Sequence, residues 1–158
     1  MNLVLNTGVL GRLCHPYNAK NRPVVAWLTA MLRTHGDQVQ IHLPEIADYE
    51  LRRKLLHMIA KGQATAKSIE RLDALGDDLD YLPLDTPVMR RAAELWAELR
   101  SRGAPTAGAR ALDADVILAA QAESVAGTVV TDNTKHLARI VDARRWTEIP
   151  PGPSSTSQ

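Results

Sequence analysis

Short apolar runs and amphipathic stretches alternate along this chain. The first run, Leu3 to Leu5, ends abruptly at the polar residues Asn6 and Thr7 and at Gly8. Three consecutive apolar residues are too few for a helix, and the lack of alternation is typical of a central strand covered on both faces. The first stretch therefore predicts a buried strand that ends at Asn6.

The same alternation continues to residue 149. Helices are predicted at residues 9–13, 23–35, 45–60, 65–75, 87–102, 111–126 and 137–141, and strands at 39–43, 81–84, 128–130 and 146–149. Pro23 and Pro87 suit the first turn of a helix, whereas Gly62 and Gly103 suit positions just after a helix. Pro83 restricts the strand at 81–84 to an edge of the sheet.

Strands that alternate with helices predict an α/β fold with a parallel sheet. The length of 158 residues suits a single domain, which we assign to residues 1–149. Residues 150–158 are rich in Pro and Ser and are expected to form a disordered tail. Residues 104–110 are mostly small and are expected to form a loop.

The composition favours a soluble cytoplasmic protein. Apolar residues make up 45% of the chain and charged residues 23%, and no apolar run is long enough for a bilayer, so no membrane partner is expected. The single cysteine, Cys14, cannot form an internal disulfide, which fits a reducing compartment. The net charge of +1 excludes a global attraction to nucleic acid, so any such partner must be held by local basic patches.

Polar residues follow the first and fourth predicted strands, at Asn6 and at Asp132-Asn133, and two helices begin with acidic residues, at 45–50 and 113–115. The carboxyl edge of a parallel sheet gathers such corners, so several oxygen ligands are expected around one pocket. Two carboxylates about 5 Å apart repel by roughly 3 kcal/mol at an effective dielectric of 20, which a cation would relieve. Oxygen donors suit Mg²⁺ or Mn²⁺ better than zinc, although each acid alone is also an ordinary helix-start residue.

Four motifs carry a family resemblance: Leu-Asn-Thr-Gly-Val-Leu at 5–10, Tyr-Glu-Leu at 49–51, Asp-Val-Ile-Leu-Ala-Ala at 115–120 and Val-Thr-Asp-Asn-Thr at 130–134. In order and spacing they resemble the PIN-domain nucleases, including VapC-type toxins. The resemblance implies a three-layer α/β/α PIN-like fold with a short central parallel sheet. It also implies a Mg²⁺- or Mn²⁺-dependent endoribonuclease with an RNA substrate, an antitoxin partner and a homodimer, for which the first two helices are the expected surface.

The resemblance also implies the site residues. The acidic positions of the family fall on Asn6, Glu50, Asp115 and Asp132, which are the expected metal ligands, with Asn133 as the other residue of the fourth region. Thr7 would orient a metal-bound water or a phosphate, unless it only caps a helix. Glu45, Asp48 and Asp113 lie beside these positions in the sequence.

Two positions depart from the family pattern. The family has aspartate where this chain has Asn6, and its fourth acid aligns more naturally with Asn133 than with Asp132. A neutral amide can ligate a cation, but it adds no negative charge and cannot help to deprotonate water. Asn6 is therefore expected to weaken or abolish cleavage, as a natural loss or an inactivating substitution. The alternative is a non-cleaving PIN-like module that binds RNA or protein.

Other readings have less support. Arg52 and His57 have the Arg-x4-His spacing of a metal-independent, all-helical ribonuclease class, but so short a pattern is better explained by chance. A phosphotransferase of the haloacid dehalogenase kind would need an aspartate after the first strand, where this chain has Asn6. Basic residues on the helices at 45–60 and 87–102 could track an RNA backbone or form a solvated face.

Overall fold

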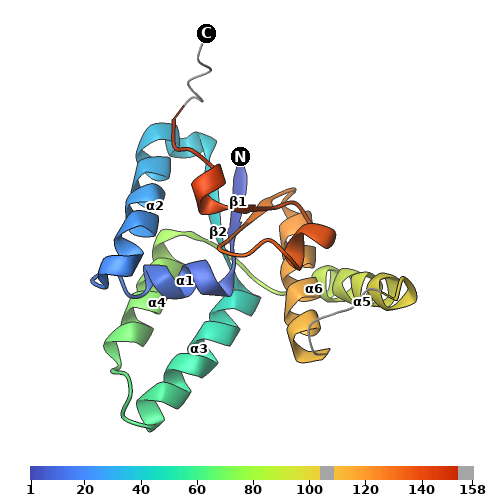
Figure 1. The fold of residues 1–158 in the computed structure, drawn as a ribbon, viewed down its shortest axis with the longest axis horizontal. Helices are drawn as coiled ribbons and strands as arrows, with labels where there is room; N and C mark the ends of the chain where they lie inside the picture. Colours follow the sequence, from blue (N-terminus) through green and yellow to red (C-terminus); the bar gives the residue numbers. More distant parts are fainter. Residues whose placement is uncertain (104–108, 153–158) are drawn as a thin grey trace.

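The computed structural model describes residues 1–103 and 109–152. Its centre is a parallel five-stranded sheet in the order β3-β2-β1-β4-β5 (Figure 1). The strands are β1 (Asn2–Leu5), β2 (Gln40–Pro44), β3 (Asp80–Leu82), β4 (Thr128–Thr131) and β5 (Ala143–Arg145). The helices are α1 (Thr7–Leu13), α2 (Arg22–His35), α3 (Glu45–Ala60), α4 (Lys67–Asp78), α5 (Thr86–Ser101) and α6 (Ala109–Ser124).

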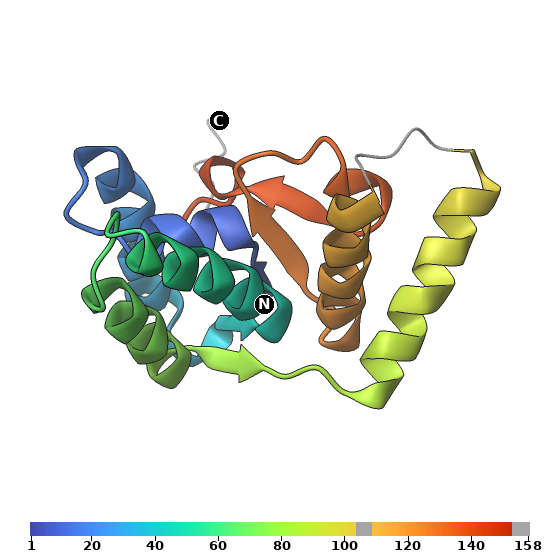
Figure 2. The same cartoon turned by 90° about the horizontal axis from the view of Figure 1, so that it is seen from below.

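Helices cover both faces of this sheet, so the predicted three-layer α/β/α architecture is confirmed. Leu3 and Leu5 of β1 pack toward α1 and α2, whereas Val4 packs toward α6. Both faces of β1 are buried, which explains its unbroken apolar run. Helix α5 packs on α6 as an outer layer, and Figure 2 shows it at the end of the molecule away from α2. Within the described residues, no helix is both long and apolar enough to cross a membrane.

The strand order brings the polar corners together. Strand β1 pairs with β2 on one side and with β4 on the other, in parallel. The carboxyl ends of β1 and β4 are therefore neighbours, and the backbone N–H of Asn6 donates to the carbonyl of Val130 at 3.0 Å. This adjacency positions the candidate site.

The edges of the sheet differ from the sequence prediction. The fifth strand is Ala143–Arg145, and the predicted strand at 146–149 is wrong because Trp146–Glu148 forms a 3₁₀ turn. The Glu148 carboxylate accepts from the backbone N–H of Arg145 at 3.0 Å, which closes this turn. Strand β3 ends at Leu82, before Pro83, since proline has no N–H to donate to a ladder.

Several helices also differ from their predicted bounds. The helix predicted at 65–75 is α4, Lys67–Asp78, so it continues through Gly76. The short helix expected at 137–141 is a 3₁₀ turn, Leu137–Arg139, and α6 begins at Ala109 rather than at residue 111. Residues 104–108 of the predicted loop and 153–158 of the predicted tail lie outside the described residues.

Gln121 of α6 is a fully buried polar residue that joins three elements. Its amide nitrogen donates to the carbonyl of Leu82 at 2.6 Å, and its amide oxygen accepts from the backbone N–H of Ile46 at 3.3 Å. Pro44, which precedes α3, supplies no side-chain cap, so Gln121 satisfies one of the N–H groups that a helix start leaves unpaired. Gln121 thereby fixes the start of α3, which carries Glu50.

Gln121→Met, which is similar in size but forms neither hydrogen bond, is expected to lower the free energy of unfolding by about 1–3 kcal/mol, because the buried N–H of Ile46 and the part-buried carbonyl of Leu82 lose this partner. Urea denaturation measures this loss. The control Gln63→Met changes an exposed residue and is expected to stay within about 0.5 kcal/mol of the parent. A loss below about 1 kcal/mol for Gln121→Met would contradict the proposed role.

Candidate active site

Asn6 joins the end of β1 to the start of α1 and to the end of β4. Its backbone is extended, and its side-chain oxygen accepts from the backbone N–H of Val9 at 2.9 Å, so it caps α1. Its amide nitrogen donates to the Thr131 hydroxyl at 2.7 Å. The polar corner after the first strand is therefore a helix cap that is also bonded to the neighbouring corner.

Thr7 connects this corner to α3. Its hydroxyl donates to a Glu50 carboxylate oxygen at 2.7 Å. The other Glu50 oxygen lies 3.8 Å from the Arg53 guanidinium, and the Glu50 side chain keeps 27% of its surface exposed. Glu50 is thus oriented by a neutral donor and only loosely paired with a cation.

Asp115 lies in the first half of α6. This helix precedes β4 and runs antiparallel to it, so its amino-terminal half lies at the carboxyl edge of the sheet. Burial raises the pKa of Asp115, the negative charge of Glu50 raises it further, and His136 acts in the opposite direction. Among the side chains that the structure describes, none forms a hydrogen bond or ion pair with Asp115. Burial is therefore the main cause of the raised pKa of Asp115, and the charge of Glu50 adds to it by less.

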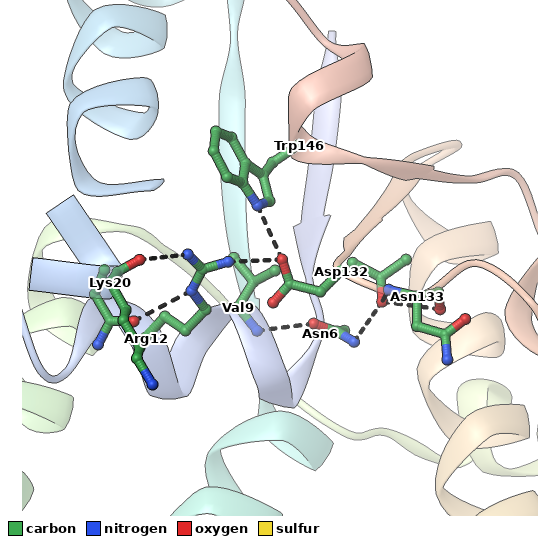
Figure 3. Close-up of polar contacts among 9 residues, drawn as sticks. Asn6, Val9, Arg12, Lys20, Asp132, Asn133 and Trp146 are labelled. Carbon is green, nitrogen blue, oxygen red and sulfur yellow. Dashed lines mark hydrogen bonds and ion pairs between the residues drawn. The ribbon is translucent and has the colours of Figure 1, made fainter. Parts of the chain in front are cut away.

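Asp132, after β4, has cationic and aromatic partners. One of its oxygens accepts from an Arg12 guanidinium nitrogen at 2.7 Å and from the Trp146 indole N–H at 2.9 Å (Figure 3). Asn133 follows as a turn residue: its side-chain oxygen accepts from the Lys135 N–H at 3.0 Å, and its own N–H donates to the Thr131 hydroxyl at 3.1 Å. Asp132 is thus charge-neutralised, whereas Asn133 serves the local turn.

The structure accordingly divides the predicted site residues. Thr7, which follows Asn6 in the chain, contacts Glu50, and the charge of Glu50 acts on Asp115. That all four of these residues converge on one metal site stays a prediction. Asp132 and Asn133 follow Thr131, which bonds both Asn6 and Asn133. That these residues act in catalysis, or that the four expected ligands bind a metal, stays a prediction.

The acids beside these positions serve other roles. Glu45 accepts the backbone N–H of Leu84. Asp48 accepts from Arg52 at 2.8 Å and from the Tyr81 hydroxyl at 2.9 Å. Asp113 lies in an apolar groove between α5 and α6, beside Trp96. The contacts of Glu45 and Asp48 explain those two acids without a metal.

The donor set at the Glu50 side suits a hard divalent cation. Two carboxylates, an amide oxygen and a hydroxyl are the oxygen ligands that Mg²⁺ or Mn²⁺ takes in proteins. Within the described residues, no group of three or more His, Cys, Asp or Glu side chains is arranged to hold a metal ion. The suitability of this region for a divalent cation therefore depends on two carboxylates, Glu50 and Asp115. The carboxylate of Asp115 is half-buried and has no partner among the described side chains.

Arg12 and Trp146 are the residues of this region that the sequence did not reveal. They come from α1 and from the turn after β5, which are remote in sequence, and no local motif links them to Asp132. The sequence instead predicts Trp146 as part of an edge strand. Only the folded structure shows that both side chains donate to Asp132.

The structure also accounts for the Arg-x4-His pattern and for the single cysteine. Arg52 of the Arg-x4-His pattern is paired with Asp48 at 2.8 Å and with Asp73 at 2.7 Å. Burial raises the pKa of Cys14 to about 11, so its thiol stays protonated at neutral pH.

Comparison with solved structures shows close similarity in fold at low sequence identity. VapBC2 from Rickettsia felis, solved bound to a DNA fragment from its promoter, is 20% identical with a TM-score of 0.67, covering 92% of this chain and 99% of that chain. FitAcB from Neisseria gonorrhoeae is 23% identical with a TM-score of 0.66, covering 92% and 98%. VapBC-1 from nontypeable Haemophilus influenzae is 19% identical with a TM-score of 0.62, covering 93% and 99%.

A family model that matches most of the chain shows its family. No curated protein matches the chain. The family model described as the PIN domain matches residues 4–142, which include the polar corners after β1 and β4 and the acidic residues of α3 and α6. The resemblance inferred from four short motifs is thereby confirmed, and the chain belongs to the PIN-domain family.

Proposed function

We propose that the chain is a divalent-metal-dependent endoribonuclease, the toxin of a toxin–antitoxin pair, which hydrolyses RNA phosphodiesters. The observation that carries the proposal is the pair of carboxylates Glu50 and Asp115, with Asp115 half-buried and raised in pKa, at the carboxyl edge of a PIN-domain sheet. Two neighbouring carboxylates of this kind destabilise the fold unless a cation lies between them.

In this proposal Glu50 and Asp115 hold Mg²⁺ or Mn²⁺, with the side-chain oxygen of Asn6 as a neutral third ligand. A divalent ion supplies an activated water and neutralises charge on the phosphoryl group that is attacked. Thr7 donates to Glu50 at 2.7 Å and so fixes the orientation of that carboxylate. Asp132 would complete the expected ligand set only after releasing Arg12. No covalent protein intermediate is required.

The proposed partners follow from the family. Similar folds occur in the VapBC and FitAB structures, which supports an antitoxin as the partner of this chain. A homodimer through α1 and α2 remains our proposal, and α2 leaves Leu32 exposed for such a contact.

Incubation of the chain with single-stranded RNAs of varied sequence, in Mg²⁺ or Mn²⁺, tests the activity. We expect slow cleavage that a chelator stops and that Glu50→Gln reduces to background. The control Glu70→Gln changes an acid of α4 and is expected to cleave like the parent. Chelator-resistant cleavage, or cleavage that survives Glu50→Gln, would disprove the proposed site.

The second candidate is a PIN-like module that binds RNA or protein without cutting. A specific observation favours it: Asn6 is neutral and already serves as a cap, and Asp132 is already neutralised by Arg12. The same assay separates the two functions, since a binding module would retard the RNA in a gel and leave it intact under every metal condition.

A further inference from the structure

Arg12, in the last turn of α1, is held in place by all three of its guanidinium nitrogens (Figure 3). Nε donates to the side-chain oxygen of Asn21 at 3.2 Å, and one terminal nitrogen donates to the carbonyl of Lys20 at 2.8 Å. The other terminal nitrogen donates to Asp132 at 2.7 Å. Two neutral acceptors thus fix the guanidinium, and its third edge meets the carboxylate.

Trp146 reinforces this pair. The Arg12 guanidinium carbon lies 5.6 Å from the centre of the Trp146 rings, and the indole N–H donates to the same Asp132 oxygen that Arg12 contacts. Trp146 in turn packs against Trp27 of α2, with ring centroids 6.4 Å apart. The partners of Asp132 therefore come from two parts of the chain, and each is fixed by contacts of its own.

We infer that Arg12 takes the place of a second divalent cation on Asp132, so that this site holds one metal ion, on the Glu50 and Asp115 side. The inference rests on the proposed function and specifies the metal content of the same site. Two-metal sites use a second ion about 4 Å from the first to neutralise further charge. In this chain a fixed guanidinium supplies positive charge where that ion would bind.

The preference for Arg12 over a free ion has a physical basis. An isolated exposed ion pair is weak, because it must immobilise two long side chains. Here the guanidinium is already positioned by Asn21, Lys20 and the indole, so contact with Asp132 requires little further ordering. A metal ion on Asp132 would have to displace the arginine and would lie beside its positive charge.

The inference also separates Asp115 from Asp132. Asp115 has no partner among the described side chains and is left for a cation, whereas Asp132 already has one. Both Thr7, which orients Glu50, and Arg12, which neutralises Asp132, lie on α1. Helix α1 therefore orients Glu50 for metal binding through Thr7 and neutralises Asp132 through Arg12.

Counting bound Mn²⁺ tests this inference without any measurement of activity. The full chain is titrated with Mn²⁺, and the free ion is measured from its electron paramagnetic resonance signal. We expect one ion in the parent, a second and weaker ion in Arg12→Gln, and one ion again in Arg12→Gln combined with Asp132→Asn. Arg71→Gln is the matched control, because Arg71 bonds backbone carbonyls, and it is expected to bind one ion.

Asp132→Asn alone keeps the test decisive should Arg12→Gln fail to fold. It is expected to change the affinity for the single Mn²⁺ by less than about threefold, because a half-exposed, already paired charge acts weakly at a distance. A loss of tenfold or more would make Asp132 a ligand and overturn the inference. So would two ions in the parent, or one ion in a folded Arg12→Gln. No Mn²⁺ uptake by the parent would instead overturn the proposed function itself.

Discussion

Asn6→Asp is expected to raise the rate of RNA cleavage by about 10²- to 10³-fold, by analogy with the restoration of a single charge-stabilising group. The change adds a carboxylate to the proposed metal site that contains Glu50 and Asp115. Aspartate caps a helix as well as asparagine does, so the bond to the Val9 N–H is retained. The Thr131 hydroxyl, which now accepts from Asn6, can turn and donate to a carboxylate.

The rate is measured on single-stranded RNA in Mg²⁺ or Mn²⁺. The matched control is Asn6→Asp combined with Asp115→Asn, which restores the original charge while leaving the new carboxylate in place. We expect this double variant, and Asn6→Asp in the presence of chelator, to lose the gain. An Asn6→Asp protein that folds but stays inert on varied RNAs would make the non-cleaving module the better assignment.

Asp115→Asn is expected to have two opposite effects. In the Asn6→Asp background it should lower cleavage by about 10²-fold or more, because it removes one of the acids proposed to bind the metal. In the metal-free protein it should raise the melting temperature at pH 7. Burial and the charge of Glu50 both disfavour the ionised carboxylate, and an amide of the same shape avoids this penalty.

The sign of the pH dependence follows from the raised pKa. A carboxyl group whose pKa is higher in the folded state than in the unfolded state holds its proton more tightly when folded, so it stabilises the fold at low pH. This contribution is lost as the pH rises through the folded-state pKa. The gain in stability from Asp115→Asn should therefore be largest at neutral pH and should shrink on acidification.

Thermal unfolding with and without Mn²⁺ measures both effects. Mn²⁺ should stabilise the parent and leave Asp115→Asn unchanged, since binding to the folded state alone raises the melting temperature. The control Asp113→Asn lies two residues earlier on α6, in the groove beside Trp96, and should behave like the parent. Destabilisation of the metal-free chain by Asp115→Asn would contradict the predicted penalty for the ionised carboxylate. Stabilisation of the variant by Mn²⁺ would show that Asp115 is not a metal ligand.

The local pattern of the chain determined most of its elements. The apolar run of β1 depends only on burial on the two faces of a strand, which neighbouring residues record. The alternation in β2 predicted the strand, although His42 is buried together with Ile41 and Leu43. Pro87 marks the start of α5 for an equally local reason. The corner at Asn6 and the acids of α3 and α6 were likewise visible, because the carboxyl edge of a parallel sheet gathers the residues that follow its strands.

Tertiary structure alone decided which of these residues meet. Gln121 reads as one position of an apolar helix, yet its side-chain oxygen accepts an N–H at the start of α3. Asp132 reads as a metal ligand, yet its nearest cation is Arg12, 120 residues earlier. Trp146 continues an apparent edge strand, yet its indole turns to Asp132. Hydrogen bonds and ion pairs between distant elements leave no periodic trace in the sequence, because each depends on the packing of the whole sheet. Burial repeats along a helix or strand, and so the sequence could specify the fold but not the partners of its charged groups.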